Sequence, residues 1–331
     1  MSDYIYEVEH LKTYFPVKSR KVISTEKQYV KAVDGVTFKV LRGETLGIVG
    51  ESGCGKSTLG RSMVRLLEPS DGKLTFEGKD ITHLTRRAMR PFRQDIQIMF
   101  QDPYASLDPR MTVGNIIAEP MDRMHTVASN QERRARVVEL MEICGINKAF
   151  INRYPHEFSG GQRQRIGISR ALSVYPKMII CDEPVSALDV SIQSQIINLL
   201  IELRERYNLT LLFISHDLGV VEYISHRVGV MYLGRIVELA NTEDIFTHPM
   251  HPYTKALLES IPHIGEYKLL SRENSLEGDI PSPVNPPSGC AFHTRCPEAC
   301  EDCKEKMPRL SEITSGHFVS CIKYKECITE E

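Results

Sequence analysis

The sequence predicts an α/β protein built on a parallel sheet, and three observations support this. Strand-like and helix-like segments alternate through the first 240 residues. The runs 45–49, 178–181 and 211–214 are almost wholly apolar, which is typical of parallel strands covered by helices on both faces. A glycine-rich loop follows the first of these runs and opens a helix, the arrangement that phosphate-binding folds require.

Composition narrows the class of protein. The chain has 331 residues, 41 of them basic and 43 acidic, a formal net charge of −2 and 41% hydrophobic residues. Enough apolar side chain exists to form a core, which excludes intrinsic disorder. The balanced charge argues against binding of duplex nucleic acid, and no run reaches the ~18 apolar residues that a membrane span needs. Because the first residues lack the apolar core of a signal peptide, we expect a cytosolic protein that meets membranes only through partners.

Each element is expected from its own periodicity. Strands are predicted over 30–40, 45–49, 96–100, 178–181 and 211–214, and helices over 58–67, 130–144, 191–206 and 253–261. The pattern changes after about residue 240, and a proline-rich stretch over 281–289 is typical of an extended linker. We therefore predict one domain over 1–240 and a C-terminal extension over 241–331.

The strongest local motif is a complete phosphate-binding loop. It consists of Gly50, Glu51, Ser52, Gly53, Cys54, Gly55, Lys56, Ser57 and Thr58. Its glycines let backbone N–H groups turn inward onto an anion, and the helix N-terminus adds positive partial charge. Lys56 can reach the β and γ phosphates and Ser57 can bind Mg²⁺. The alternative is a glycine-rich turn that carries an exposed lysine.

Further motifs follow in a fixed order. Gln101 comes after a strand, Phe158–Gln162 precedes the strand that ends at Asp182, and Ser186–Asp189 and His216 follow. This order resembles the ABC ATPase family over residues 15–220, with these segments as its Q-loop, signature, Walker B strand, D-loop and switch histidine. The resemblance implies a P-loop NTPase fold of the RecA-like type, with an antiparallel β-subdomain and a helical subdomain inserted at about 102–154.

The chemistry of these residues fits the implied roles. Asp182, at the end of a strand, can hold Mg²⁺ through water. The adjacent Glu183 can polarise the water that attacks the γ-phosphate; the alternative is that the two carboxylates only cap the next element. His216 can donate to a γ-phosphate oxygen, and the amide of Gln101 can contact both water and Mg²⁺.

The signature is a second anion-binding surface, and one chain cannot use both surfaces on one nucleotide. In the family, the signature of one subunit closes over the phosphate-binding loop of another, which implies a head-to-tail pair that encloses two ATP molecules. An aromatic residue of the first strand stacks on adenine in the family, although a core aromatic is the alternative here. The ATP contacts implied outside the loop are Phe15, Ser159, Gly160, Gly161, Gln162 and Asp189.

Narrower segments indicate a branch of the family. Residues Lys31–Val36, Phe100–Arg110, His251–Leu258 and Gly289–Pro297 resemble the second, F-type ATPase subunit of bacterial oligopeptide and dipeptide importers. The resemblance implies ATP-driven peptide import at the cytoplasmic face of the cell membrane. It also implies a second, D-type ATPase subunit, two permeases and an extracellular or lipoprotein binding protein as partners. The alternatives are an importer ATPase for another small cargo such as nickel, and a soluble ABC ATPase without transport.

Nine cysteines are present, and six crowd the last forty-odd residues. In a reducing compartment such a cluster predicts a metal site before a set of disulfides. The spacing of Cys290, Cys296, Cys303 and Cys321 matches that of the family. Four thiolates can hold a [4Fe–4S] cluster or, alternatively, zinc, and Cys300 and Cys327 are extra candidate ligands. We expect a structural metal that helps a tail with few apolar residues to fold.

Overall fold

The computed structural model describes residues 3–17, 27–102, 104–260 and 278–328. The chain divides into two compact units. The first unit comprises Met1–Val40, Leu46–Thr82 and His216–Glu331, and the second comprises Leu41–Thr45 and His83–Ser215. The predicted boundaries at residue 240 and at 102–154 stay predictions. No helix of the described residues combines the length and apolar character that crossing a bilayer requires.

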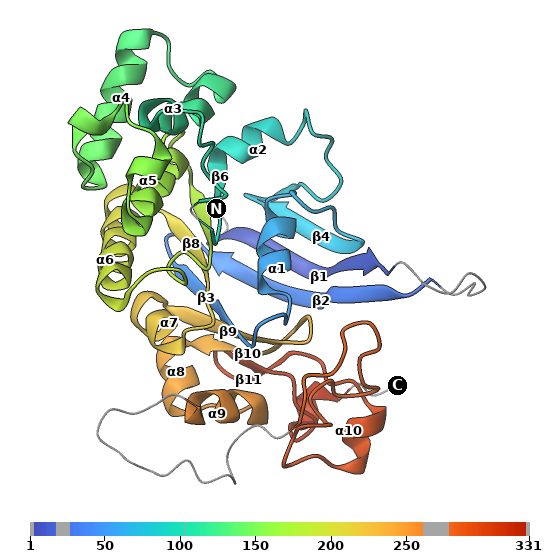
Figure 1. The fold of residues 1–331 in the computed structure, drawn as a ribbon. Coiled ribbons are helices and arrows are strands. Elements are labelled where there is room, and N and C mark those ends of the chain that lie inside the picture. Colours follow the sequence, from blue (N-terminus) through green and yellow to red (C-terminus); the bar gives the residue numbers. More distant parts are fainter. Residues whose placement is uncertain (1–2, 18–26, 103, 261–277, 329–331) are drawn as a thin grey trace. The chain divides into compact units, whose positions relative to one another are not determined.

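The first unit contains a four-stranded sheet in the order β2-β1-β4-β5 (Figure 1). Its strands are β1 Tyr4–Pro16, β2 Tyr29–Leu41, β4 Asp71–Phe76 and β5 Lys79–Asp80. The pairs β1–β4 and β4–β5 are antiparallel. Alternate residues are buried over Tyr6–Val8 and Leu11–Thr13 of β1, on either side of a register shift, and over Asp34–Val40 of β2, so these segments follow the period of two that a half-buried sheet requires. This sheet is the antiparallel part that the resemblance implied.

The first unit also contains strands in the order β11-β12-β10-β9-β3. They are β3 Thr45–Val49, β9 Arg227–Tyr232, β10 Arg235–Asn241, β11 Ser311–Thr314 and β12 His317–Val319. Strand β3 pairs parallel with β9, whereas β10 pairs antiparallel with both β9 and β12. The hairpin β11–β12 of the C-terminal extension thus adds to a sheet of the cassette, a pairing that the sequence did not predict.

The helices of the first unit lie before or after these strands in the sequence. They are α1 Lys56–Met63, α7 Leu218–Ile224, α8 Thr242–Thr247, α9 Pro252–Glu259 and α10 Glu301–Glu305. Helix α1 begins two residues earlier than predicted and ends at Met63, and the last residue of the predicted helix 253–261 lies outside the described residues.

The second unit contains three parallel strands in the order β8-β7-β6. They are β6 Ile96–Met99, β7 Met178–Asp182 and β8 Thr210–Ile214, and every residue of β7 and β8 is buried. Full burial on both faces explains why these runs are continuously apolar. The predicted parallel α/β sheet is therefore confirmed.

The helices of the second unit are α2 Arg90–Asp95, α3 Val113–Met124, α4 Asn130–Ile143, α5 Gly160–Leu172 and α6 Val190–Tyr207. Of these, α4 and α6 match the helices predicted over 130–144 and 191–206 closely. Side-chain caps define two of the starts: Ser129 Oγ accepts from the N–H of Glu132, and Asp189 Oδ1 accepts from the N–H of Ile192. Helices α3, α4 and α5 pack on one another (Figure 1).

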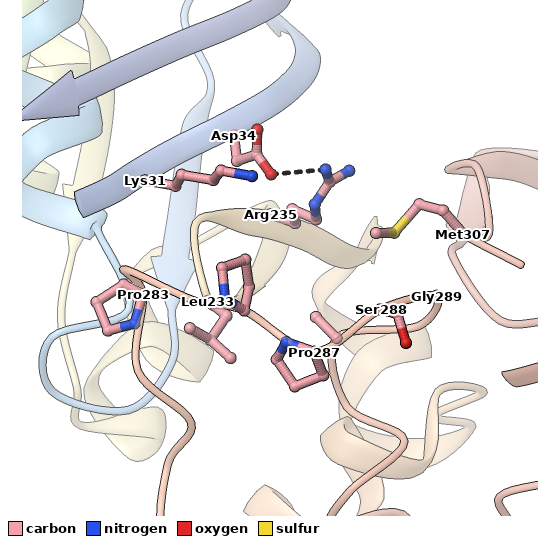
Figure 2. Close-up of a pocket in the computed structure, with 11 residues that line it drawn as sticks. Lys31, Asp34, Leu233, Arg235, Pro283, Pro287, Ser288, Gly289 and Met307 are labelled. Carbon is pink, nitrogen blue, oxygen red and sulfur yellow. Dashed lines mark hydrogen bonds and ion pairs between the residues drawn. The ribbon is translucent and has the colours of Figure 1, made fainter. Parts of the chain in front are cut away.

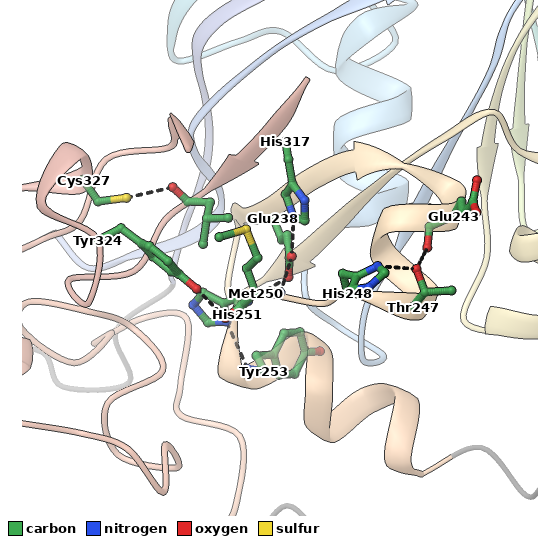
Figure 3. A network of polar contacts seen from close by, with 11 residues as sticks. Glu238, Glu243, Thr247, His248, Met250, His251, Tyr253, His317, Tyr324 and Cys327 are labelled. Atoms are coloured by element: carbon green, nitrogen blue, oxygen red, sulfur yellow. Dashed lines mark hydrogen bonds and ion pairs between the residues drawn. The ribbon is translucent and has the colours of Figure 1, made fainter. Parts of the chain in front are cut away.

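A buried carboxylate joins the C-terminal extension to β10 (Figure 3). Glu238 is 0% exposed, and its oxygens accept from the backbone N–H groups of Met250 and His251 and lie 2.7 Å from His317 Nε2. Burial alone would raise the pKa of Glu238, but these hydrogen bonds outweigh burial and lower it. One carboxylate thus ties together β10, the start of α9 and β12.

The side chain of His251, whose backbone N–H donates to this carboxylate, is neutral at pH 7. Burial lowers the pKa of His251 to about 4. Its Nδ1 can therefore accept a hydrogen bond, and it accepts one of 3.0 Å from the N–H of Tyr253 at the start of α9. This bond fixes the first turn of α9 and with it the side chain of Tyr253.

Candidate nucleotide-binding site

The loop between β3 and α1 has a backbone that only glycine can adopt at two points. Gly50 and Gly55 have φ of 151° and 107°. A Cβ atom on Gly50 would lie 2.1 Å from the carbonyl oxygen of Met231, and one on Gly55 would lie 2.0 Å from that of Ala32. Because neither contact is sterically possible, the loop is shaped as a close backbone cradle. This geometry fits a phosphate-bearing ligand.

Lys56 lies inside this cradle. Its side chain is buried, and Nζ donates to the carbonyl oxygens of Gly50 at 2.7 Å and Glu51 at 3.0 Å. The ammonium group is therefore held at the loop, where it can neutralise the charge of a bound anion. Ser57 and Thr58 follow in the first turn of α1. Burial raises the pKa of the Cys54 thiol, against the effect of the Lys56 charge.

Two residues of the C-terminal extension reach the loop, and the sequence assigned neither of them a role. The guanidinium of Arg295 forms an ion pair with the carboxylate of Glu51, and the hydroxyl of Tyr253 accepts from the N–H of Glu51. Both residues lie within segments that resemble the importer subunits. No local pattern predicts contacts across 244 and 202 residues of chain.

The predicted adenine contact, Phe15, lies near the end of β1 and is 36% exposed. Its neighbour Tyr14 is engaged elsewhere, because its hydroxyl donates to the carboxylate of Asp34. An exposed ring can offer a face for stacking, so Phe15 stays the predicted contact.

A cavity of about 240 Å³ lies beside the proline-rich linker (Figure 2). Asp34 and Arg235 form a 2.6 Å ion pair on one wall, and prolines of the linker form another. The N–H of Lys31 donates to the carbonyl oxygen of Pro283, which holds the linker against β2. None of the predicted ATP contacts lines this cavity.

The second unit brings two predicted catalytic residues together. Gln101 Nε2 donates to Glu183 Oε2 at 2.8 Å. Glu183 follows the wholly buried Asp182 at the end of β7, and its φ of 48° lies in the left-handed region, which costs on the order of 1 kcal/mol. Because the N–H of Glu183 donates to the carbonyl oxygen of Ile214, a bond to β8 fixes this conformation. The carboxylate oxygens of Asp182 and the amide oxygen of Gln101 are the type of ligand that Mg²⁺ prefers.

The predicted signature residues form the start of α5. Ser159 Oγ accepts from the N–H of Gln162, and Gln162 Oε1 accepts from the N–H of Ser159. This reciprocal pair is a capping box. Gly161 packs closely on α6, since a Cβ there would lie 2.4 Å from Ile192 Cγ2. Ser159 is exposed, as is Asp189 at the cap of α6.

The remaining predicted residues divide between the units. Phe15, the phosphate-binding loop and His216 belong to the first unit. Gln101, the signature, Asp182, Glu183 and Asp189 belong to the second. His216 is exposed directly after β8.

The four cysteines predicted to bind metal lie near one another, but their side chains are not arranged around a common metal position in the described residues. Burial raises the pKa of Cys290, Cys296 and Cys321, nearby thiols that include Cys303 add to the effect, and each pKa reaches about 11. The described residues contain no set of three or more His, Cys, Asp or Glu side chains arranged to hold a metal ion.

The prediction of a [4Fe–4S] cluster or a zinc site is therefore not supported. Cys303 and the two extra candidate ligands have other contacts: Cys303 Sγ lies 3.3 Å from Cys300 Sγ, and the Cys327 thiol donates to the carbonyl oxygen of Val319. All nine cysteines lie within the described residues, and none forms a disulfide.

Two family descriptions match the chain. "ABC transporter" matches residues 33–186, and "Oligopeptide/dipeptide transporter, C-terminal region" matches residues 237–303. The chain is 54% identical to the oligopeptide transport ATP-binding protein AppF of Bacillus subtilis, with 97% of each chain covered. It is 51% identical to the oligopeptide transport ATP-binding protein OppF of Salmonella typhimurium, with 96% of each covered.

Solved structures show the same fold. The dimeric ATP-binding cassette MJ0796, bound to ADP and Pi, is 27% identical with a TM-score of 0.63, over 72% of this chain and 98% of the other. CbiO1 of Clostridium perfringens, described as part of the ABC transporter complex cbiONQ, is 30% identical with a TM-score of 0.63, over 75% and 92%. The similarity in sequence thus spans both the cassette and the extension, and the structural similarity spans about three quarters of the chain.

Proposed function

Because this chain belongs to the ABC transporter ATPases, in the family of oligopeptide transport ATP-binding proteins, we propose that it hydrolyses ATP to power the import of peptides. The observation that carries the proposal is the 54% identity to an oligopeptide transport ATP-binding protein over 97% of both chains. At that level the similarity includes the extension as well as the cassette.

ATP is held, in this proposal, by its phosphates on the loop Gly50–Thr58 and by its adenine on Phe15. The cradle shaped by Gly50 and Gly55 and the buried ammonium of Lys56 support this role. Mg²⁺, bound by Ser57, Asp182 and Gln101, would neutralise charge that develops on the phosphates.

Glu183 is the proposed general base for the attacking water, with Gln101 as its positioning partner and His216 as a donor to the γ-phosphate. The 2.8 Å bond between Gln101 and Glu183 supports this pairing. A carboxylate can accept hydrogen bonds at both of its oxygens, so the bond from the Gln101 amide is compatible with proton transfer from water to the same group.

The proposed active form is a head-to-tail pair with a second, D-type ATPase subunit. An exposed Ser159 at the N-terminus of the thirteen-residue helix α5 supports it, because such an end can meet phosphate brought by another chain. The pair is proposed to sit at the cytoplasmic face of the membrane beneath two permeases, which an extracellular or lipoprotein binding protein supplies with peptide.

Transport in proteoliposomes tests the proposal. The chain is reconstituted with the D-type subunit, permeases and binding protein encoded beside it, with ATP on the ATPase side. Accumulation of a labelled peptide that requires ATP is expected. Uptake of Ni²⁺ without uptake of peptide would support the alternative cargo, and ATP hydrolysis without any uptake would support a non-transport ATPase.

Metal binding by the extension stays a prediction from the spacing of Cys290, Cys296, Cys303 and Cys321, and no step of the proposed cycle uses it. We expect iron and acid-labile sulfide in protein purified without oxygen. Zinc in a one-to-one ratio would support the alternative metal, and protein free of both would overturn the prediction.

A further inference from the structure

The structure points to a link between the C-terminal extension and the phosphate-binding loop, made through Glu51. Each polar group of Glu51 has a partner. Its N–H donates to the hydroxyl of Tyr253 at 3.0 Å, its carbonyl oxygen accepts from Lys56, and its carboxylate pairs with Arg295. Two of these three partners come from the extension.

The ion pair has the geometry of the strongest type. Arg295 donates from Nη1 to Glu51 Oε2 at 2.8 Å and from Nη2 to Oε1 at 3.0 Å. Two parallel bonds fix direction as well as distance. The side chain of Arg295 is only 4% exposed and that of Glu51 22%, so solvent screens the pair less than it screens a surface pair.

Arg295 itself is held in place by an aromatic cluster. Its N–H donates to the carbonyl oxygen of Phe292. The ring of Phe292 packs 5.3 Å from both Tyr232 and Tyr253, which lie 4.7 Å from each other between ring centres. All three rings are buried. Because Arg295 is anchored to these closely packed rings, its guanidinium restrains the position of the Glu51 carboxylate that it binds.

From these contacts we infer that Arg295 is a positioning residue for nucleotide binding, which holds the phosphate-binding loop through Glu51 in its receptive conformation. The inference rests on the proposed role of the loop. Lys56 binds the carbonyl oxygens of Gly50 and Glu51, so movement of Glu51 also displaces the ammonium that neutralises phosphate. The C-terminal extension therefore contributes to ATP affinity without contacting ATP.

Steady-state kinetics of Arg295→Met in the full chain tests the inference. We expect KM for ATP and Kd for a fluorescent ATP analogue to rise about tenfold, equivalent to ~1.4 kcal/mol, with kcat at saturating ATP within about twofold of the original. Arg295→Lys is expected to stay impaired, because an ammonium cannot form the two parallel bonds. If Arg295→Lys restored KM and Kd fully, the positive charge alone would explain the effect, and the inference that Arg295 positions Glu51 would be overturned.

A double-mutant cycle adds a second criterion. Glu51→Gln is expected to match Arg295→Met, and the double variant to be no worse than either single one, since both remove the same interaction. Additive effects would overturn the link. Lys304→Met is the matched control, because it breaks the exposed Lys304–Glu301 pair of α10 and leaves KM unchanged. If Arg295→Met does not fold, Glu51→Gln tests the same pair from the more exposed side.

Hydrogen exchange separates this inference from the proposed function, because it needs no nucleotide. Amides of the loop are expected to exchange faster in Arg295→Met and Glu51→Gln than in the original protein, with exchange in α10 unchanged. Unchanged loop exchange would overturn the inference even if ATP binds. A protein whose loop loosens as expected, but which binds no ATP, would contradict the proposed function alone.

Discussion

Lys56→Ala is expected to weaken ATP binding by roughly a hundredfold, the equivalent of ~3 kcal/mol for a charge-assisted hydrogen bond to phosphate. The ammonium is buried in the loop and bound to the carbonyl oxygens of Gly50 and Glu51. Alanine leaves those oxygens facing the phosphates with no cation between them. Titration with a fluorescent ATP analogue measures the change in Kd.

Lys12→Ala serves as the matched control for that titration. Lys12 belongs to the same unit and forms an ion pair with Asp71, but it is 35% exposed and lies in β1. It is expected to bind ATP as the original protein does. A Kd for Lys56→Ala within about threefold of this control would remove the loop from the proposed nucleotide site.

Glu183→Gln is expected to lower the rate of ATP hydrolysis by about a hundredfold to a thousandfold, within the range for loss of a general base, while ATP still binds. Glutamine keeps an oxygen that can accept from Gln101 Nε2, so the 2.8 Å bond survives, but it cannot take a proton from water. Phosphate release measures hydrolysis, and size-exclusion chromatography with the D-type subunit and ATP is expected to show a stable pair.

Glu205→Gln controls for the loss of one carboxylate, since Glu205 is 68% exposed and forms an ion pair with its neighbour Arg204. Ordinary turnover by Glu183→Gln would show that another group is the base. A loss of turnover without ATP-dependent pairing would retain the base and contradict the proposed head-to-tail pair.

Local patterns predicted the parallel part of the fold well. Strands β7 and β8 are buried on both faces, and burial on both faces leaves a continuous apolar run in the sequence. Helices α4 and α6 begin within one residue of their predicted starts, because Ser129 and Asp189 supply caps that depend only on residues three positions away.

Other strands were missed because nothing local marks them. The strands β11 and β12 are four and three residues long, and they become strands by pairing with each other and with β10. Glu238 interrupts an apolar run in β10, and its burial depends on His317, which lies 79 residues away. The cysteine spacing predicted a metal site that the arrangement of the side chains does not support.

The same division holds at the site. The loop Gly50–Thr58 could be predicted directly from the sequence. Positive φ angles and close backbone contacts allow only glycine at certain positions, so the glycines recur at fixed spacings that are visible in the sequence. The pairing of Gln101 with Glu183 and of Glu51 with Arg295 joins residues 82 and 244 positions apart. Such contacts result from tertiary packing. A short segment of sequence does not predict them, because neither residue of a pair requires a particular residue type at the positions next to it.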